Sequence, residues 1–72
     1  MRDIYEITEV ESLLAFSVIE NRTPYGKFYL IEKDADYQIT YVAIDNTTGD
    51  AWTEEFDDKE KMLAWLRGDI EL

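Results

Sequence analysis

The segment between residues 37 and 68 combines the pattern of a β-hairpin with that of an amphipathic helix, and no other stretch constrains the fold as strongly. Residues 37–44 alternate between two faces in β-branched and aromatic residues, which predicts a strand. Residues 45–50 are Asp, Asn, Thr and Gly, which favour tight turns, and Gly49 accepts a positive φ without strain. Residues 50–56 then predict the returning strand.

The length of the turn predicts which residues pair across this hairpin. A loop of residues 46–49 places Ala43 opposite Trp52 and Ile39 opposite Phe56, so apolar side chains meet across the ladder. A slip of two residues would change these partners but would leave every side chain on its own face. The predicted faces therefore do not depend on the register.

A helix is predicted directly after the hairpin. Asp57 fits the N-cap position, with Glu60 three residues later as in a capping box, and Gly68 fits the position just past the end. Between them an apolar stripe has helical spacing and consists of Met62, Leu63, Trp65 and Leu66. We expect the first core contacts between hairpin and helix to come from Trp52, Phe56, Met62 and Leu66.

Residues 2–20 fit more than one pattern. Residues 2–7 alternate as in a strand, whereas Thr8 and Glu11 have the spacing of a capping box that opens a helix over residues 9–16. Further on, the apolar residues fit both a helical and a strand spacing. We predict an extended or short helical start, followed by a strand at residues 15–20.

The middle of the chain predicts a second hairpin strand. Residues 21–26 contain Pro24 and Gly26 and read as a loop, residues 27–33 alternate as a strand, and residues 34–36 form the next turn. Residues 1–72 therefore predict a single α+β domain. It has an antiparallel sheet of three to four strands, with one C-terminal helix packed on a face.

The composition excludes several kinds of site. The chain has no cysteine and no histidine, which removes disulfides, thiolate metal sites and the usual nucleophile–base pairs. Ser12 and Ser17 are interpreted as structural. The sequence contains no apolar run long enough to span a membrane and no signal-peptide pattern. We expect a cytoplasmic protein that is not an enzyme and holds no metal or cofactor.

Two polar features were weighed as chemical sites. Glu54 is the carboxylate to follow, because alternation places it on the face of Trp52 and Phe56. The 45–50 loop fails the EF-hand pattern, since Asp50 would stand where that motif requires glycine. We interpret the loop as a solvated hairpin turn, with weak cation binding by Asp45 and Asp50 as the alternative. The loop also contains a glycosylation acceptor pattern at residues 46–48, without a secretory context to support it.

The charge balance is the strongest bulk signal. Seventeen acids and seven bases give a formal net charge of −10, which argues against direct binding of nucleic acid or an anionic membrane. Residues 45–60 alone hold seven acids and one base, Lys59. A solvated face is one interpretation. The other is a contact patch for a basic protein, with candidate residues Asp50, Glu54, Glu55, Asp57, Asp58 and Glu60.

Two resemblances accompany these observations. In size, charge and compactness, the chain resembles small acidic inhibitors of phages and mobile elements that imitate the charge of nucleic acid, although it matches none of their motifs. The run YVAIDNTTGDAWTEEF followed by MLAWL resembles small uncharacterised proteins of Gram-positive bacteria and their phages. Neither resemblance implies a role for any single residue.

Two functions therefore stand beside each other. In the first, the protein is an acidic, non-catalytic module that docks on a basic protein, and salt weakens the complex. In the second, it is a structural protein that forms a homodimer, and the association tolerates salt. This dimer would use a free strand edge or the tyrosines expected to be exposed, which are Tyr25, Tyr29, Tyr37 and Tyr41.

Overall fold

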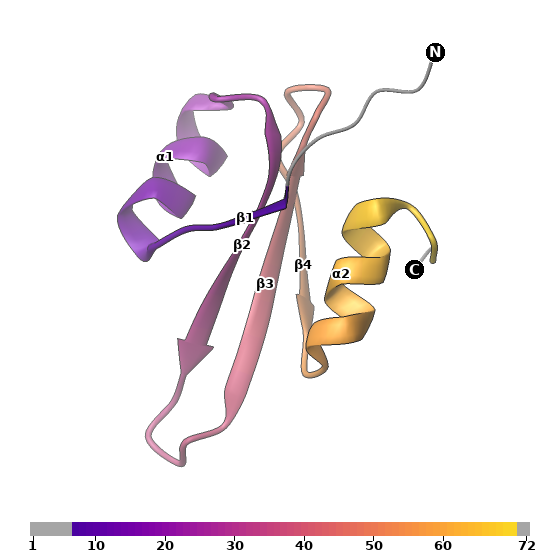
Figure 1. The fold of residues 1–72 in the computed structure, drawn as a ribbon. Coiled ribbons are helices and arrows are strands. Elements are labelled where there is room, and N and C mark those ends of the chain that lie inside the picture. Colours follow the sequence, from indigo (N-terminus) through magenta and orange to yellow (C-terminus); the bar gives the residue numbers. More distant parts are fainter. Residues whose placement is uncertain (1–6, 71–72) are drawn as a thin grey trace.

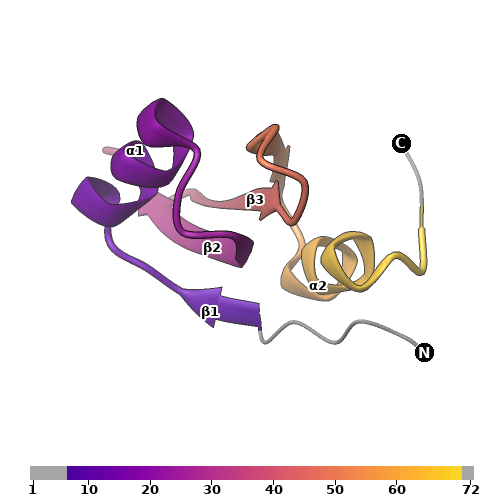
Figure 2. The ribbon, with the colours of Figure 1, turned by 90° about the horizontal axis from the view of Figure 1, so that it is seen from above.

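The fold is built on the hairpin of two long, alternating strands in the middle of the chain. The computed structural model describes residues 7–70. Within them the elements are β1 (Ile7–Glu9), α1 (Ser12–Asn21), β2 (Gly26–Lys33), β3 (Ile39–Asn46), β4 (Trp52–Phe56) and α2 (Lys59–Arg67). The described strands form one sheet in the order β1-β2-β3-β4. Figure 1 and Figure 2 show α1 and α2 on opposite sides of this sheet.

The sheet is mixed, so the prediction of a purely antiparallel sheet is wrong at its first edge. β1 runs parallel to β2, whereas the β2–β3 and β3–β4 pairs are antiparallel. Parallel neighbours need a crossover connection of about a dozen residues or more, and α1 with its flanking loops supplies it. The strand predicted at residues 2–7 lies, except for Ile7, outside the described residues.

The strand predicted at residues 15–20 is wrong, because this segment forms the helix α1. The helical period places Ala15 and Val18, which are 3% and 0% exposed, against the sheet. The alternative helix at residues 9–16 overlaps α1 only over residues 12–16, because α1 begins later and extends to Asn21. Its capping box does not form, because the N-cap is Glu11 and makes no side-chain cap hydrogen bond.

The alternation of the central strands produces a core on each face of the sheet. One core contains Leu30, Val42 and Ile44 beneath α1. The other core lies beneath α2 and contains Tyr29, Ala43, Phe56, Met62 and Leu66. The expected core positions of the last three residues are confirmed. Burial of Met62 and Leu66 contributes about 1.5–3 kcal/mol per side chain.

The register of the β3–β4 hairpin differs from the predicted one by two residues. The observed pairs include Ala43–Glu54, Tyr41–Phe56 and Asp45–Trp52. The predicted pairs, Ala43–Trp52 and Ile39–Phe56, are therefore wrong, while the faces are confirmed. β3 also begins at Ile39 rather than at Tyr37, which has a φ of 62° and lies in the preceding turn. The turn between β3 and β4 is longer than expected and spans residues 47–51.

Helix α2 begins one residue later than predicted. Its N-cap is Asp58, whose Oδ1 accepts from the backbone N–H of Glu60 at 2.8 Å and of Lys61 at 3.4 Å. The predicted capping box between Asp57 and Glu60 is therefore wrong. The C-terminal prediction is confirmed, because Gly68 follows the last helical residue with a φ of 84°. No helix in residues 7–70 combines the length and apolar content needed to cross a membrane.

Candidate functional site

The predicted contact residues run from the β3–β4 turn through β4 to the first turn of α2. We call the following set the acidic edge: Asp50, Glu54, Glu55, Asp57, Asp58 and Glu60. Within residues 7–70, β4 pairs only with β3, so its other edge is free of a neighbouring strand. All six residues except the half-buried Glu54 are exposed.

The structure does not place all six carboxylates on one face. Glu54 lies on the α2 face of β4, together with Trp52 and Phe56, as the alternation predicts. Glu55 points to the opposite face, where it lines a hollow of about 150 Å³ beside Phe16 of α1. Within β4, the acidic edge therefore carries charge on both sides of the sheet.

The carboxylates of the acidic edge differ in the hydrogen bonds that they accept within the protein. Asp58 caps α2, and the Oδ2 of Asp50 accepts from the Oγ1 of Thr48 at 3.0 Å. Glu54 accepts from the indole N–H of Trp52 at 2.8 Å. The other three carboxylates accept no hydrogen bond from the described part of the chain. They belong to Glu55, Asp57 and Glu60.

Basic side chains of the described residues do not pair with the acidic edge. The one ion pair in residues 7–70 joins Arg67 Nε to Asp69 Oδ2 at 3.1 Å. Arg22 reaches the upper end of the edge, but its Nη1 donates to the backbone carbonyls of Gly49 and Asp50 at 3.3 and 3.1 Å. The acidic edge is therefore not neutralised by an ion pair within residues 7–70.

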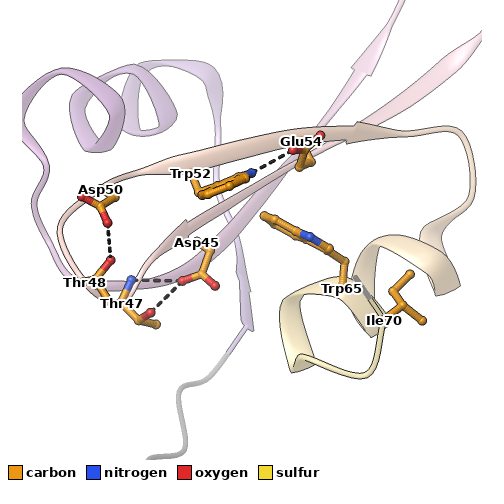
Figure 3. Close-up of a pocket in the computed structure, with 8 residues that line it drawn as sticks. All are labelled: Asp45, Thr47, Thr48, Asp50, Trp52, Glu54, Trp65 and Ile70. Carbon is orange, nitrogen blue, oxygen red and sulfur yellow. Dashed lines mark hydrogen bonds between the residues drawn. The ribbon is translucent and has the colours of Figure 1, made fainter. Parts of the chain in front are cut away.

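An open pocket of about 370 Å³ lies between the β3–β4 turn and α2 (Figure 3). Its apolar wall consists of Trp52, Trp65 and Ile70. Its polar wall consists of Asp45, Thr47, Thr48, Asp50 and Glu54. We call this the tryptophan pocket, and two of its carboxylates belong to the acidic edge.

Trp52 was expected in the core, and this expectation is wrong. The side chain is 61% exposed, because the two-residue shift in register puts it opposite Asp45 near the end of the hairpin. Trp65 is half-buried and packs on Phe56, with ring centroids 5.9 Å apart. Sequence reasoning missed the pocket. The available signal was the alternation of Trp52 with Glu54 on the face that α2 covers.

The 45–50 loop is held together by its own polar side chains. Oδ1 of Asp45 accepts from the backbone N–H and the Oγ1 of Thr47, at 3.1 and 2.8 Å. In residues 7–70, no three His, Cys, Asp or Glu side chains converge as ligands for a metal ion would. Asn46, the first residue of the glycosylation pattern, is fully buried and hydrogen-bonded, which makes its amide inaccessible to modification.

The tyrosines expected on the surface divide into two groups. Tyr25 and Tyr37 are exposed, at 62% and 78%. Tyr29 is buried at 8% exposure and Tyr41 is half-buried, and both contact the α2 core, so the expectation is wrong for this pair. Of the four tyrosines expected to be exposed, Tyr25 and Tyr37 remain available for a homodimer.

Comparison with protein families, curated proteins and solved structures finds no match for this chain. No residue role is therefore transferred to it from a relative. The roles proposed below depend on the geometry of the acidic edge and of the tryptophan pocket.

Proposed function

We propose that this protein is a small, non-catalytic binding module of the cytoplasm, whose acidic edge docks on a basic surface of a partner protein. The supporting observation is the run of carboxylates from the β3–β4 turn to the first turn of α2, which form no ion pair with a basic side chain of residues 7–70. Carboxylates left unpaired on a surface attract a basic partner over a range of about 8 Å at physiological ionic strength. They also exclude partners of like charge.

The partner best suited to this edge is a protein whose own ligand is nucleic acid. Such a protein presents lysine and arginine side chains in a row that matches a phosphate backbone. The acidic edge places six carboxylates within residues 50–60, and their combined negative charge complements such a surface. The protein would then act as an inhibitor that imitates nucleic acid, as phage and mobile-element inhibitors do.

Affinity capture from a lysate of the source organism tests this function. The immobilised protein should retain a nucleic-acid-binding protein that elutes at moderate salt, since screening weakens contacts between exposed charges. Added duplex DNA or RNA should release the same protein at constant salt, because it competes for one basic surface. A captured protein that resists both salt and nucleic acid would contradict the proposal.

A second candidate function is self-association, and one observation favours it. Helix α1 carries apolar side chains on its outer side, where Leu13 is 83% and Phe16 is 62% exposed. Exposed apolar side chains on the outer side of a surface helix are typical of a helix that another molecule covers. The free edge of β4 suits a homodimer poorly, because Glu54 and Glu55 would meet like charges across the new ladder.

Light scattering at 0.15 M and 1 M NaCl tests the second function. A dimer formed through α1 should persist at high salt, because burial of apolar surface is not screened. Phe16→Glu should convert such a dimer to a monomer without loss of helical signal. A monomer at both salt concentrations would remove this function.

A further inference from the structure

We infer that the tryptophan pocket is an anchor site for an arginine side chain of the basic partner. This inference deepens the proposed function and rests on it, since the arginine belongs to the surface on which the acidic edge docks. Three features of the pocket support it: the indole faces, the carboxylate oxygens that accept no hydrogen bond from residues 7–70, and the lack of a cation from the same residues.

The aromatic wall offers a flat face to a ligand. Trp52 is 61% exposed, and the one aromatic ring pair in residues 7–70 joins Trp65 to Phe56, so Trp52 stacks on no other ring of these residues. Figure 3 shows the two indoles in the lining of the pocket, one from β4 and one from α2. A guanidinium stacks on such faces and is attracted by the ring quadrupole.

The carboxylates around the indoles keep one acceptor oxygen each. Oε2 of Glu54 accepts from the Trp52 indole N–H at 2.8 Å, and this bond fixes the ring and the carboxylate relative to each other. Oδ1 of Asp45 is used by Thr47. The other oxygen of each carboxylate accepts no hydrogen bond from the described residues. A guanidinium has five N–H donors in a planar fork, which suits two acceptors beside an aromatic face.

The described residues supply no cation to these tryptophans. In residues 7–70, the cation–π contacts are Lys33 over Tyr37, at 5.6 Å to the ring centroid, and Lys59 over Tyr29, at 6.0 Å. Both lie outside the pocket lining. A second copy of this chain carries a net charge of −10 and would be repelled by the carboxylates of the pocket. An arginine side chain from a basic partner carries the positive charge that complements the carboxylates, and its planar guanidinium suits the indole faces.

The probe for this site is N-acetylarginine amide, titrated into ¹⁵N-labelled protein and followed by NMR. The indole N–H signals of Trp52 and Trp65 should shift in a saturable manner. N-acetylcitrulline amide, which has the same shape without the charge, should leave them unchanged. Nα-acetyllysine amide, which keeps its ε-ammonium, should bind more weakly, because an ammonium does not stack on an aromatic ring. Equal shifts with arginine and citrulline, or no shift with arginine, would overturn the inference.

Matched variants locate the binding. Trp52→Ala removes an exposed ring, and Glu54→Gln keeps the acceptor for the Trp52 N–H while removing the charge. Each should weaken arginine-amide binding by about 3- to 30-fold. Glu55→Gln, the neighbouring acid on the opposite face, should change it less than about 2-fold. Equal effects of Glu54→Gln and Glu55→Gln would overturn the assignment to the pocket.

The two proposals fail separately. Salt-sensitive capture of a basic protein without any response to the arginine amide would remove the arginine site and leave the acidic edge as the binding surface. An arginine-amide response without a salt-sensitive partner would remove the proposed function and leave a pocket for a guanidinium.

Discussion

Asn46 is a fully buried amide that joins the two loops at the upper end of the sheet. Its Nδ2 donates to the carbonyl of Pro24 at 2.9 Å, and its Oδ1 accepts from the backbone N–H of Ala51 at 3.0 Å. Asn46→Ala leaves both groups without this partner, so the free energy of unfolding should fall by about 1–3 kcal/mol. Urea denaturation measures this change.

Asn21 provides the control for that substitution. Its Nδ2 donates to the Ser17 Oγ at 3.3 Å in an exposed position, so Asn21→Ala should change the unfolding free energy by less than about 0.5 kcal/mol. Equal losses for the two asparagines would show that the buried contacts of Asn46 do not tie the loops together.

The sequence predicted which residues of the candidate site are acidic and which face of the sheet they occupy, but not how exposed or buried individual side chains are. The charge pattern identified the acids of β4, and alternation placed Glu54 with Trp52 on one face. The exposure of Trp52 was not predictable, because it depends on the register of the β3–β4 hairpin. The predicted and the observed registers differ by two residues and place every side chain on the same face, so alternation does not distinguish them. The buried role of Asn46 was hidden for a similar reason, since asparagine is also an ordinary turn residue.

Two neighbouring aspartates at the start of α2 differ in their contribution to this helix. Asp58 accepts hydrogen bonds from two backbone N–H groups of the first turn, whereas the Asp57 side chain accepts none from the described residues. Asp58→Ala should lower the unfolding free energy by about 0.5–2 kcal/mol, and Asp57→Ala by less than about 0.5 kcal/mol. Thermal unfolding of both variants checks this, and a larger loss for Asp57→Ala would contradict the assigned cap.

The elements of the second half follow from local pattern, and those of the first half do not. The apolar residues of β4 fit only the period of a strand, and those of α2 fit only the period of a helix. Turn residues precede β4, and cap residues mark both ends of α2. Residues 12–21 fit two periods, and the choice between them depends on the sheet face of Leu30, Val42 and Ile44, which lies far away in the sequence. The parallel pairing of β1 depends on the same helix, because only a crossover brings β1 beside β2.

The whole molecule depends on one sheet that serves two cores. Alternate residues of β2 and β3 enter the α1 core and the α2 core, so loss of one core removes support from the other. Leu66→Ala, in the α2 core, should lower the unfolding free energy by about 2–5 kcal/mol. Tryptophan fluorescence near α2 and the amide signal of Val18 in α1 should report one common midpoint in urea.

Leu13→Ala is the matched control, because Leu13 is 83% exposed on α1 and its loss should change the unfolding free energy by less than about 0.5 kcal/mol. An α1 signal that survives after the fluorescence change is complete would contradict the coupling of the two cores.

Position of charge, and not total charge, is what the proposed function requires. The variant Glu55→Lys/Asp57→Lys/Glu60→Lys reverses three acids of the acidic edge whose side chains accept no hydrogen bond from the described residues. The variant Glu9→Lys/Glu20→Lys/Asp36→Lys reverses three exposed acids outside the acidic edge. Both variants have the same net charge, and both leave the Asp58 cap and the two cores intact.

The most direct measurement is the amount of partner that these two variants capture at 0.15 M NaCl, after circular dichroism has shown that both are folded. The edge variant should lose capture by at least about 10-fold, and the control variant should retain it within about 2-fold, since contacts beyond a Debye length are screened. Equal capture by the two variants would contradict the assignment of binding to the acidic edge.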